Sequence, residues 1–172
     1  MTFLKLVKSR ESIRDYNPDH PVEKEKLDRI LEAGRLAPSA ANRQPWKFYV
    51  VSKPENLSRI RRCYHKAWFS DAPHVLIVAG KSKNAWTRAT DGYNSLETDL
   101  TIAMDHMILA AEAEGIATCW IAAFDPVALK NSGITGTDET VFAITPLGYP
   151  RPGFSKKGNK LRKAAEDVIV YL

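Results

Sequence analysis

The spacing of apolar residues along the chain predicts helices that alternate with short strands. Apolar residues three or four positions apart indicate an amphipathic helix, whereas alternating or continuous apolar runs of about four to eight residues indicate strands. The expected helices are residues 2–8, 21–35, 54–66, 96–115 and 126–131, and the expected strands are residues 46–51, 74–80, 117–124 and 140–150. This alternation predicts a sheet wrapped by helices, in the α/β or α+β class.

Two of these segments have a distinctive pattern. Residues 74–80, HVLIVAG, are apolar throughout after the histidine and end in glycine, which is typical of a central strand buried on both faces. The helix expected at 96–115 has an apolar stripe that ends at Gly115, a residue suited to the C′ position. The stripe consists of Leu100, Ala103, Met107, Ala110 and Ala111. Its alanines make the helix slim, which fits both a two-fold subunit interface and close packing within one chain.

The composition is that of an ordinary globular domain. Of the 172 residues, 44% are hydrophobic and 26% are charged. A chain of this length can bury a full hydrophobic core, and no internal repeat or low-complexity stretch divides it. We therefore expect a single domain over residues 1–172, with a basic C-terminal extension at 151–172.

The apolar runs are short for a membrane protein. The run at 75–80 has six residues, against roughly 20 for a spanning helix, and the first residues have no apolar stretch typical of a secretion signal. Cys63 and Cys119 lie outside any CxxC pair or metal-ligand spacing. We expect a cytoplasmic protein with no membrane partner and no metal, in which both cysteines are plain small hydrophobic residues.

The positive charge is concentrated in the C-terminal extension. The chain carries a net charge of +5, and residues 151–172 hold six basic against two acidic residues. A basic tail is typical of a solvated surface or a nonspecific nucleic-acid contact, or it completes an anion site if a second basic cluster meets it. Phe154 alone interleaves an aromatic ring with the charges of 151–163, which argues against a nucleic-acid partner.

A second basic cluster lies near the start of the chain, in KSRESIRDY at 8–16. Arg10, Ser12 and Arg14 stand at i, i+2 and i+4, so their side chains share one side of an extended segment. Two guanidinium groups and a hydroxyl can bind a phosphomonoester, and Lys160 and Arg162 of the tail can complete the site. The alternative is a set of surface ion pairs with the acidic residues interspersed among the arginines.

The chain lacks the common catalytic motifs. It contains no P-loop, no GxGxxG and no GxSxG sequence, and its four histidines are scattered. An enzyme built from this chain would therefore need a cofactor to carry the chemistry.

Four motifs, taken in their order along the chain, resemble those of the FMN-dependent nitroreductase family. They are Arg10-x-Ser12-x-Arg14-x-Tyr16, APSAANRQPWKF at 37–48, GIATCWIAAFDP at 115–126, and PLGYP at 146–150 followed by the basic tail. The resemblance implies an α+β fold that is α/β-like in its three layers, with a central, mostly antiparallel sheet flanked by helices. It also implies an intertwined homodimer with FMN at the subunit interface.

The resemblance assigns the phosphate of FMN to the two basic clusters, with Arg10, Ser12, Arg14, Lys160 and Arg162 as its ligands. The backbone N–H groups of Ala122 and Ala123 match the family positions that face flavin N5 and the C4 carbonyl. Many relatives have glycine at one of these two positions, where this chain has alanine.

The loop at 36–45 matches the family's Pro-Ser-x-x-Asn motif, which reaches the flavin bound mainly by the other subunit. The matching residues are Pro38, Ser39, Ala40 and Asn42. Small side chains would let the backbone lie against a flat ring, and Ser39 and Asn42 would form hydrogen bonds at its polar edge. An ordinary helix-to-strand connection would explain the turn residues, but not why the loop is small throughout.

The activity implied by the resemblance is that of an NAD(P)H-dependent flavin oxidoreductase. Hydride would pass from NADH or NADPH through FMN to a small electron-poor acceptor, such as a nitroaromatic or a quinone, in a ping-pong cycle. No side chain is expected to act as acid or base. The alternative is an FMN-binding protein with little turnover, for flavin storage or sensing, which would use the same residues.

Two further groups of residues are candidates for roles near the flavin. Lys81, Lys83 and Arg88 are candidates for a cation near flavin N1. Trp68, Phe69, Trp86 and Tyr93 are candidates for the wall of the acceptor pocket, with an ordinary place in the core as the alternative for each.

Overall fold

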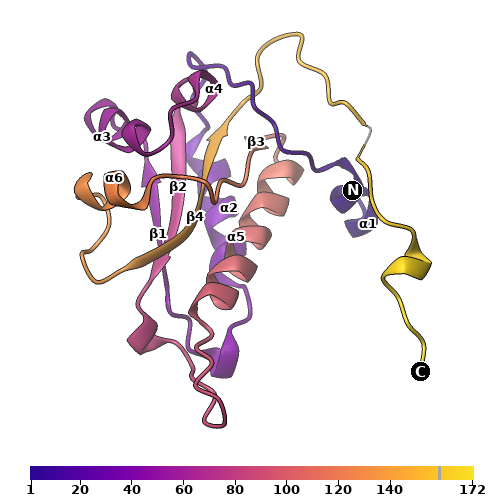
Figure 1. Ribbon diagram of the computed structural model, residues 1–172. Coiled ribbons are helices and arrows are strands. Elements are labelled where there is room, and N and C mark those ends of the chain that lie inside the picture. The colour runs from indigo at the N-terminus through magenta and orange to yellow at the C-terminus, as the bar shows by residue number, and fades with distance from the viewer. Residues whose placement is uncertain (159) are drawn as a thin grey trace.

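The fold has three layers, with helices on both faces of a central sheet (Figure 1). The computed structural model describes residues 1–158 and 160–172. The strands are β1 (Trp46–Val51), β2 (His74–Gly80), β3 (Ala117–Thr118) and β4 (Thr140–Gly148). The α-helices are α1 (Phe3–Ser9), α2 (Lys24–Arg35), α3 (Pro54–Ile60), α4 (Ala67–Ser70), α5 (Leu96–Ala113) and α6 (Pro126–Asn131). Short 3₁₀ turns occupy Ala40–Asn42, Arg61–Cys63, Ser82–Asn84 and Ala165–Asp167.

The sheet is antiparallel throughout its four strands, in the order β1-β2-β4-β3. All seven residues of β2 are buried, which confirms the prediction of a central strand covered on both faces. The N-terminal segment extends the sheet beyond β3, because Ser12 forms a parallel bridge with Thr118 and the N–H of Ile13 donates to the Thr118 carbonyl at 2.9 Å. The expected α+β class and mostly antiparallel sheet are confirmed.

Two hydrophobic cores lie on opposite faces of the sheet. Leu76 and Val78 of β2 face α2 and α5, whereas Val75 and Ile77 face the side of α3, α4 and α6. Gly34 lets α2 approach α5 closely, since a Cβ atom there would lie 2.6 Å from Cγ of Met107. The stripe predicted for α5 is largely confirmed as buried, and the helix ends before Gly115 at φ +74°.

The third strand is much shorter than predicted. Only Ala117 and Thr118 form β3, although Ile121 pairs with Ile144 of β4 in the same register further on. The ladder is interrupted because Pro146 has no N–H to donate, and because the N–H of Cys119 donates to the Thr145 side chain at 3.1 Å. Beyond Ile121 the chain leaves the sheet, so the prediction of a strand to residue 124 was wrong.

The helix predicted at 54–66 was also wrong in its second half. Regular helix ends at Ile60, and after a 3₁₀ turn Tyr64 is extended, with φ −152°. The carbonyl of Cys63 accepts the N–H of Asp125 at 2.7 Å instead of an intrahelical donor. This long-range bond ties the turn to α6 and ends the helical pattern.

The helix predicted from residue 21 begins at Lys24, because the backbone of Glu23 is extended, with ψ 144°, and Val22 before it packs beside a buried histidine. The N–H of Val22 donates to Nε2 of His74 at 3.0 Å, and Nδ1 of His74 lies 2.7 Å from Oγ of Ser52. Since Nε2 accepts, the proton is on Nδ1, which donates to the serine. Burial lowers the pKa of His74, so the neutral ring is the form that makes these contacts.

Both cysteines are buried and unpaired in disulfides, as expected. Burial raises the pKa of the Cys63 thiol to about 11. A thiol with this pKa is a poor nucleophile at neutral pH.

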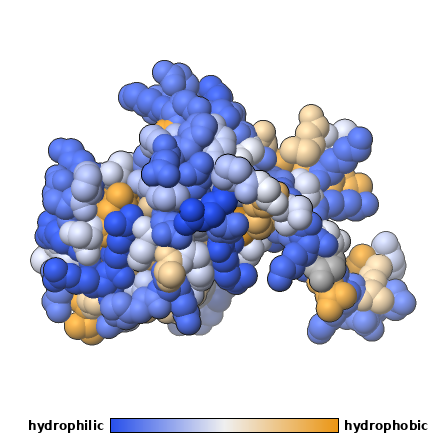
Figure 2. All heavy atoms as spheres, turned by 90° about the horizontal axis from the view of Figure 1, so that it is seen from above, coloured by the Kyte–Doolittle hydropathy of each residue, from blue (hydrophilic) through white to orange (hydrophobic). Residues whose placement is uncertain are grey.

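The two ends of the chain carry uncovered apolar residues. The C-terminal tail extends away from the sheet on the side of α1 (Figure 1), and apolar atoms are visible on this projecting part in Figure 2. On α1, Phe3 is 70% and Leu4 62% exposed. The exposed apolar residues of the tail are Leu161, Val168, Ile169, Val170, Tyr171 and Leu172. Within the described residues, no helix is long and apolar enough to cross a membrane.

Candidate functional site

Residues from both ends of the chain meet in one shallow depression, which we call the basic hollow. It has a volume of about 270 Å³ and is lined by Arg10, Glu11, Ser12, Lys157, Lys160 and Arg162. The four cations come from the two sequence clusters that were expected to converge. Across the described parts of the chain, none of the four forms an ion pair with a carboxylate within 4 Å.

The cations of the basic hollow repel one another. Partial burial lowers the pKa of the Lys160 ammonium, and the nearby Arg10 and Arg162 lower it further. Its Nζ donates to the carbonyls of Val7 at 2.9 Å and Lys8 at 3.1 Å, which leaves one N–H unused by these two acceptors. An anion in the hollow would relieve this repulsion, so the arrangement is suited to a phosphate group.

Arg14 lies beside the basic hollow rather than in it. It lines an adjacent cavity of about 310 Å³, which Phe154 also lines and which shares Glu11, Ser12 and Lys157 with the basic hollow. Its guanidinium also lies 5.9 Å from the centre of the Trp68 ring. The structure therefore brings together Arg10, Ser12, Lys160 and Arg162, with Arg14 next to them.

The small-residue loop is held in an unusual backbone conformation. Ala41, Asn42 and Gln44 have φ values of 48°, 54° and 49°. Such left-handed conformations cost about 1–2 kcal/mol for residues such as alanine and glutamine, and less for asparagine. The N–H of Gln44 donates to Oγ of Ser39 at 2.9 Å. Strain of this kind persists only where the surroundings enforce it, and it is typical of ligand-binding segments.

The anchor of this loop is Asp99, a buried carboxylate on α5. Its Oδ1 accepts the N–H of Ala40 at 2.9 Å, and its Oδ2 accepts the hydroxyl of Ser95 at 2.8 Å. Asp99 is only 1% exposed. It was not among the site residues predicted from the sequence, although its place between Leu96 and Leu100 on the apolar face of the helix was a signal.

The loop and the basic hollow lie at opposite ends of the sheet. Trp46, which follows the loop, pairs with Gly80 at one end of β2. Ser12 forms a bridge with Thr118 of β3, Thr118 pairs with Leu147 of β4, and Leu147 pairs with His74 at the other end of β2. Six residue steps along a strand span about 20 Å. One chain therefore does not bring its own loop to its own basic hollow.

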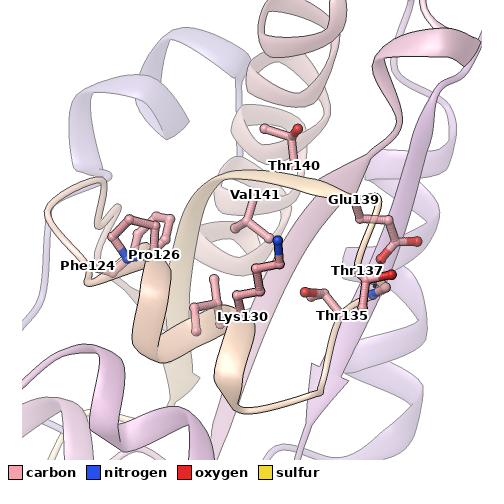
Figure 3. Close-up of a pocket in the computed structure, with 10 residues that line it drawn as sticks. Phe124, Pro126, Lys130, Thr135, Thr137, Glu139, Thr140 and Val141 are labelled. Carbon is pink, nitrogen blue, oxygen red and sulfur yellow. Dashed lines mark hydrogen bonds between the residues drawn. The ribbon is translucent and has the colours of Figure 1, made fainter.

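Ala122 and Ala123 lie on the exposed segment between β3 and α6. Neither of their N–H groups donates to another backbone group within the described chain. The segment leads into a hollow of about 260 Å³ that begins at Phe124 and lies between α6 and the start of β4 (Figure 3). On the opposite side of this hollow, Glu139 accepts the hydroxyl of Tyr49 at 2.5 Å and the N–H of Gly136 at 2.7 Å.

The candidates for a cation near the flavin differ in their surroundings. Lys81 pairs with Asp138 at 2.8 Å, and Arg88 pairs with Asp91 at 2.6 Å. Lys83 is exposed.

Of the aromatic candidates, one is core and three reach the surface. Phe69 is fully buried, so it does not form a pocket wall. Trp68 and Trp86 are half-buried, and Tyr93 is exposed, with its hydroxyl bonded to Thr98. Within the described residues, no group of three or more His, Cys, Asp and Glu side chains could hold a metal ion.

Comparison with known proteins decides the family. The family model described as "Nitroreductase family" matches residues 7–69 and 57–149. The chain belongs to the nitroreductase family. A relative from Methanothermobacter thermautotrophicus, provisionally named an NADH dehydrogenase/NAD(P)H nitroreductase, is 33% identical over 161 residues, covering 87% of this chain and 78% of the relative.

Solved structures of nitroreductases share the fold. A nitroreductase family protein from Clostridium difficile superposes with a TM-score of 0.90 at 30% identity, covering 99% of this chain and 98% of that one. A second protein from the same species, described as an FMN-dependent nitroreductase, has a TM-score of 0.81 at 26% identity, with 98% of both chains covered. The nitroreductase fold expected from the four sequence motifs is thereby confirmed.

Proposed function

We propose that this member of the nitroreductase family is an FMN-dependent oxidoreductase that uses NADH or NADPH to reduce a small electron-poor acceptor. The observation that carries the proposal is the basic hollow, where Arg10, Lys157, Lys160 and Arg162 lie together. Among the ion pairs within 4 Å of the described residues, none includes these four cations. The pKa of Lys160 is lowered first by partial burial and then by the nearby Arg10 and Arg162, and this repulsion among the cations favours a dianion as the ligand. FMN ends in such a phosphate group.

The ligands of the phosphate would be Arg10, Ser12, Lys160 and Arg162, with Arg14 approaching from the adjacent cavity. A guanidinium offers paired N–H donors to phosphate oxygens, and the serine hydroxyl adds a short neutral donor. The hollow is open to solvent, so salt would weaken this part of the binding.

The binding site for the flavin ring would be completed by a second copy of the chain. The loop at 38–42 lies about 20 Å along the sheet from the hollow of its own chain, so the loop that reaches the ring would come from a partner subunit. The uncovered apolar residues of α1 and the tail support such a homodimer, because exposed apolar clusters are typical of association surfaces.

The chain's contribution to the reaction would be binding, orientation and exclusion of water. The chemistry that a bound FMN supplies is hydride transfer, from NADH or NADPH to the acceptor, in the two half-reactions of a ping-pong cycle. The N–H groups of Ala122 and Ala123 would donate to the polar edge of the ring, and the small loop of the partner would lie against it. Ser39 and Asn42 would supply further hydrogen bonds.

An anaerobic mixing experiment tests this function. Purified protein is loaded with FMN, freed of excess flavin and oxygen, and mixed with NADH or NADPH while the visible flavin absorbance is followed. Bleaching within seconds, reversed by adding a nitroaromatic or a quinone, is the expected result. A yellow colour that persists with both reductants would instead identify a flavin-holding protein with little turnover.

A further inference from the structure

The basic hollow contains one acidic side chain, Glu11, whose charge opposes the binding of an anion. It lies between Arg10 and Ser12 in the sequence and lines the same depression as Lys160 and Arg162. A carboxylate within a few ångströms of a phosphate repels it. A role other than contact with the phosphate is therefore needed to explain its position.

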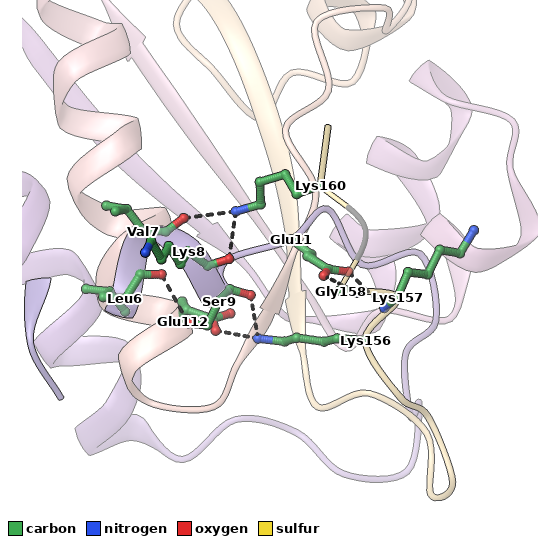
Figure 4. A network of polar contacts seen from close by, with 10 residues as sticks. All are labelled: Leu6, Val7, Lys8, Ser9, Glu11, Glu112, Lys156, Lys157, Gly158 and Lys160. Carbon is green, nitrogen blue, oxygen red and sulfur yellow. Dashed lines mark hydrogen bonds and ion pairs between the residues drawn. The ribbon is translucent and has the colours of Figure 1, made fainter. Parts of the chain in front are cut away.

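Glu11 binds the backbone of the tail. One carboxylate oxygen accepts the N–H of Lys157 at 3.2 Å, and the other accepts the N–H of Gly158 at 2.9 Å (Figure 4). Gly158 has φ +66°, and a Cβ atom there would meet nothing within 4 Å, so the conformation rather than space favours glycine. Successive N–H groups around such a residue form a concave site for an anion, here a carboxylate of the same chain.

Two lysine side chains, one on each side of residues 157–158, bind the tail to α1 and α5. Lys156 donates to the carbonyl of Ser9 at 3.1 Å and pairs with Glu112 of α5. Lys160 donates to the last carbonyls of α1, where a cation is favoured by the helix dipole. In Figure 4 the three attachments follow one another along the tail, with that of Glu11 in the middle.

We propose that Glu11 is a positioning residue, which holds the tail by its backbone so that Lys160 and Arg162 lie opposite Arg10. The proposal rests on the proposed function, in which these cations bind the phosphate of FMN. The proposal predicts the opposite of what the net charge of the hollow alone would suggest for FMN affinity. Removing the negative charge of Glu11 should weaken FMN binding, although the hollow becomes more positive.

The test measures the dissociation constant of FMN for the apoprotein, by quenching of flavin fluorescence at fixed ionic strength. We expect Glu11→Ala to raise the constant about tenfold, because two hydrogen bonds to a charged group are lost, and Glu11→Gln to raise it less. Asp15→Asn is the matched control, since Asp15 lies on the same segment but pairs with Arg151. Its effect should stay below about twofold.

Two further readouts separate positioning from a general loss of structure. In the Lys160→Ala/Arg162→Ala background, Glu11→Ala should have less than about a twofold effect on the dissociation constant, because both side chains that it positions are gone. In the apoprotein, hydrogen exchange of the tail amides around residues 157–158 should quicken in Glu11→Ala while the unfolding temperature stays close to that of the wild type.

The possible failures are distinguishable. Glu11→Ala binding FMN as tightly as the wild type, or more tightly, would show that Glu11 is only a repulsive neighbour and would overturn the proposal. Unchanged exchange of the tail amides would overturn it as well. A wild-type protein that takes up no FMN would instead refute the proposed function, and the positioning role with it.

Discussion

The loop anchor at Asp99 gives a sharp prediction, because a single carboxylate holds a strained segment. Replacing it in Asp99→Ala removes the acceptor of the Ala40 N–H and of the Ser95 hydroxyl. The left-handed residues Ala41 and Asn42 would then lose the contact that keeps them in place. The loop should relax toward less strained conformations.

The size of the effect follows from the two hydrogen bonds. A bond to a charged partner contributes about 1.5–3 kcal/mol, and a buried hydroxyl left without a partner adds a penalty. Relief of backbone strain in the loop offsets part of this loss. We expect Asp99→Ala to lower the free energy of unfolding by about 3 kcal/mol, and Asp99→Asn, which keeps one acceptor oxygen, by about 1–2 kcal/mol. For a chain of this size, 3 kcal/mol corresponds to a drop of about 6–12 °C in the unfolding temperature.

The assay is thermal unfolding of the apoprotein at one fixed protein concentration, followed by circular dichroism. Asp105→Ala is the matched control, because Asp105 is an exposed carboxylate on the same helix and should change stability by less than about 0.5 kcal/mol. Trypsin cleavage after Arg43, in the loop, should also become faster in Asp99→Ala. If Asp99→Ala and Asp105→Ala unfold at the same temperature, Asp99 does not anchor the loop.

Two further predictions concern the scaffold of the site. Burial lowers the pKa of His74, so its contribution to stability is complete above the unfolded-state pKa of about 6.5 and is lost as the pH falls below it. The unfolding free energy should accordingly fall less steeply from pH 7 to pH 5 in His74→Gln than in the wild type, and equal slopes would contradict this account. Gly80→Ala should lower the free energy of unfolding, measured by urea titration, by about 1–3 kcal/mol. The reason is that the added Cβ would lie 2.5 Å from the Pro45 carbonyl oxygen. An unchanged urea midpoint would show that the loop before β1 moves aside without cost.

The parts of the fold that follow local patterns could be predicted from the sequence. The apolar run of β2, the alternation of β1 and the stripe of α5 each carry their own signal, and the structure has these elements within two residues of the predicted bounds. The predictions failed where a distant group takes a backbone donor or acceptor. The N–H of Asp125 binds the Cys63 carbonyl, and the Thr145 side chain accepts the Cys119 N–H.

In the candidate site too, the features with a local sequence pattern were predicted and those set by distant contacts were not. The spacing of Arg10 and Ser12 and the charge of the tail predicted an anion site, and the structure gathers these residues in the basic hollow. The supporting carboxylates of Asp99 and Glu11 were not predicted, because each acts by accepting a backbone N–H from a segment far away in the chain. Sequence spacing carries little information about such contacts.

The most direct test of the whole account compares FMN with riboflavin, which has the same ring but no phosphate. Apoprotein is titrated with each flavin under identical conditions, and flavin fluorescence gives the two dissociation constants. The account predicts that FMN binds at least about a hundredfold more tightly than riboflavin, because several charge-assisted bonds to the phosphate are lost. Equal affinities for the two flavins, or no binding of either, would contradict it.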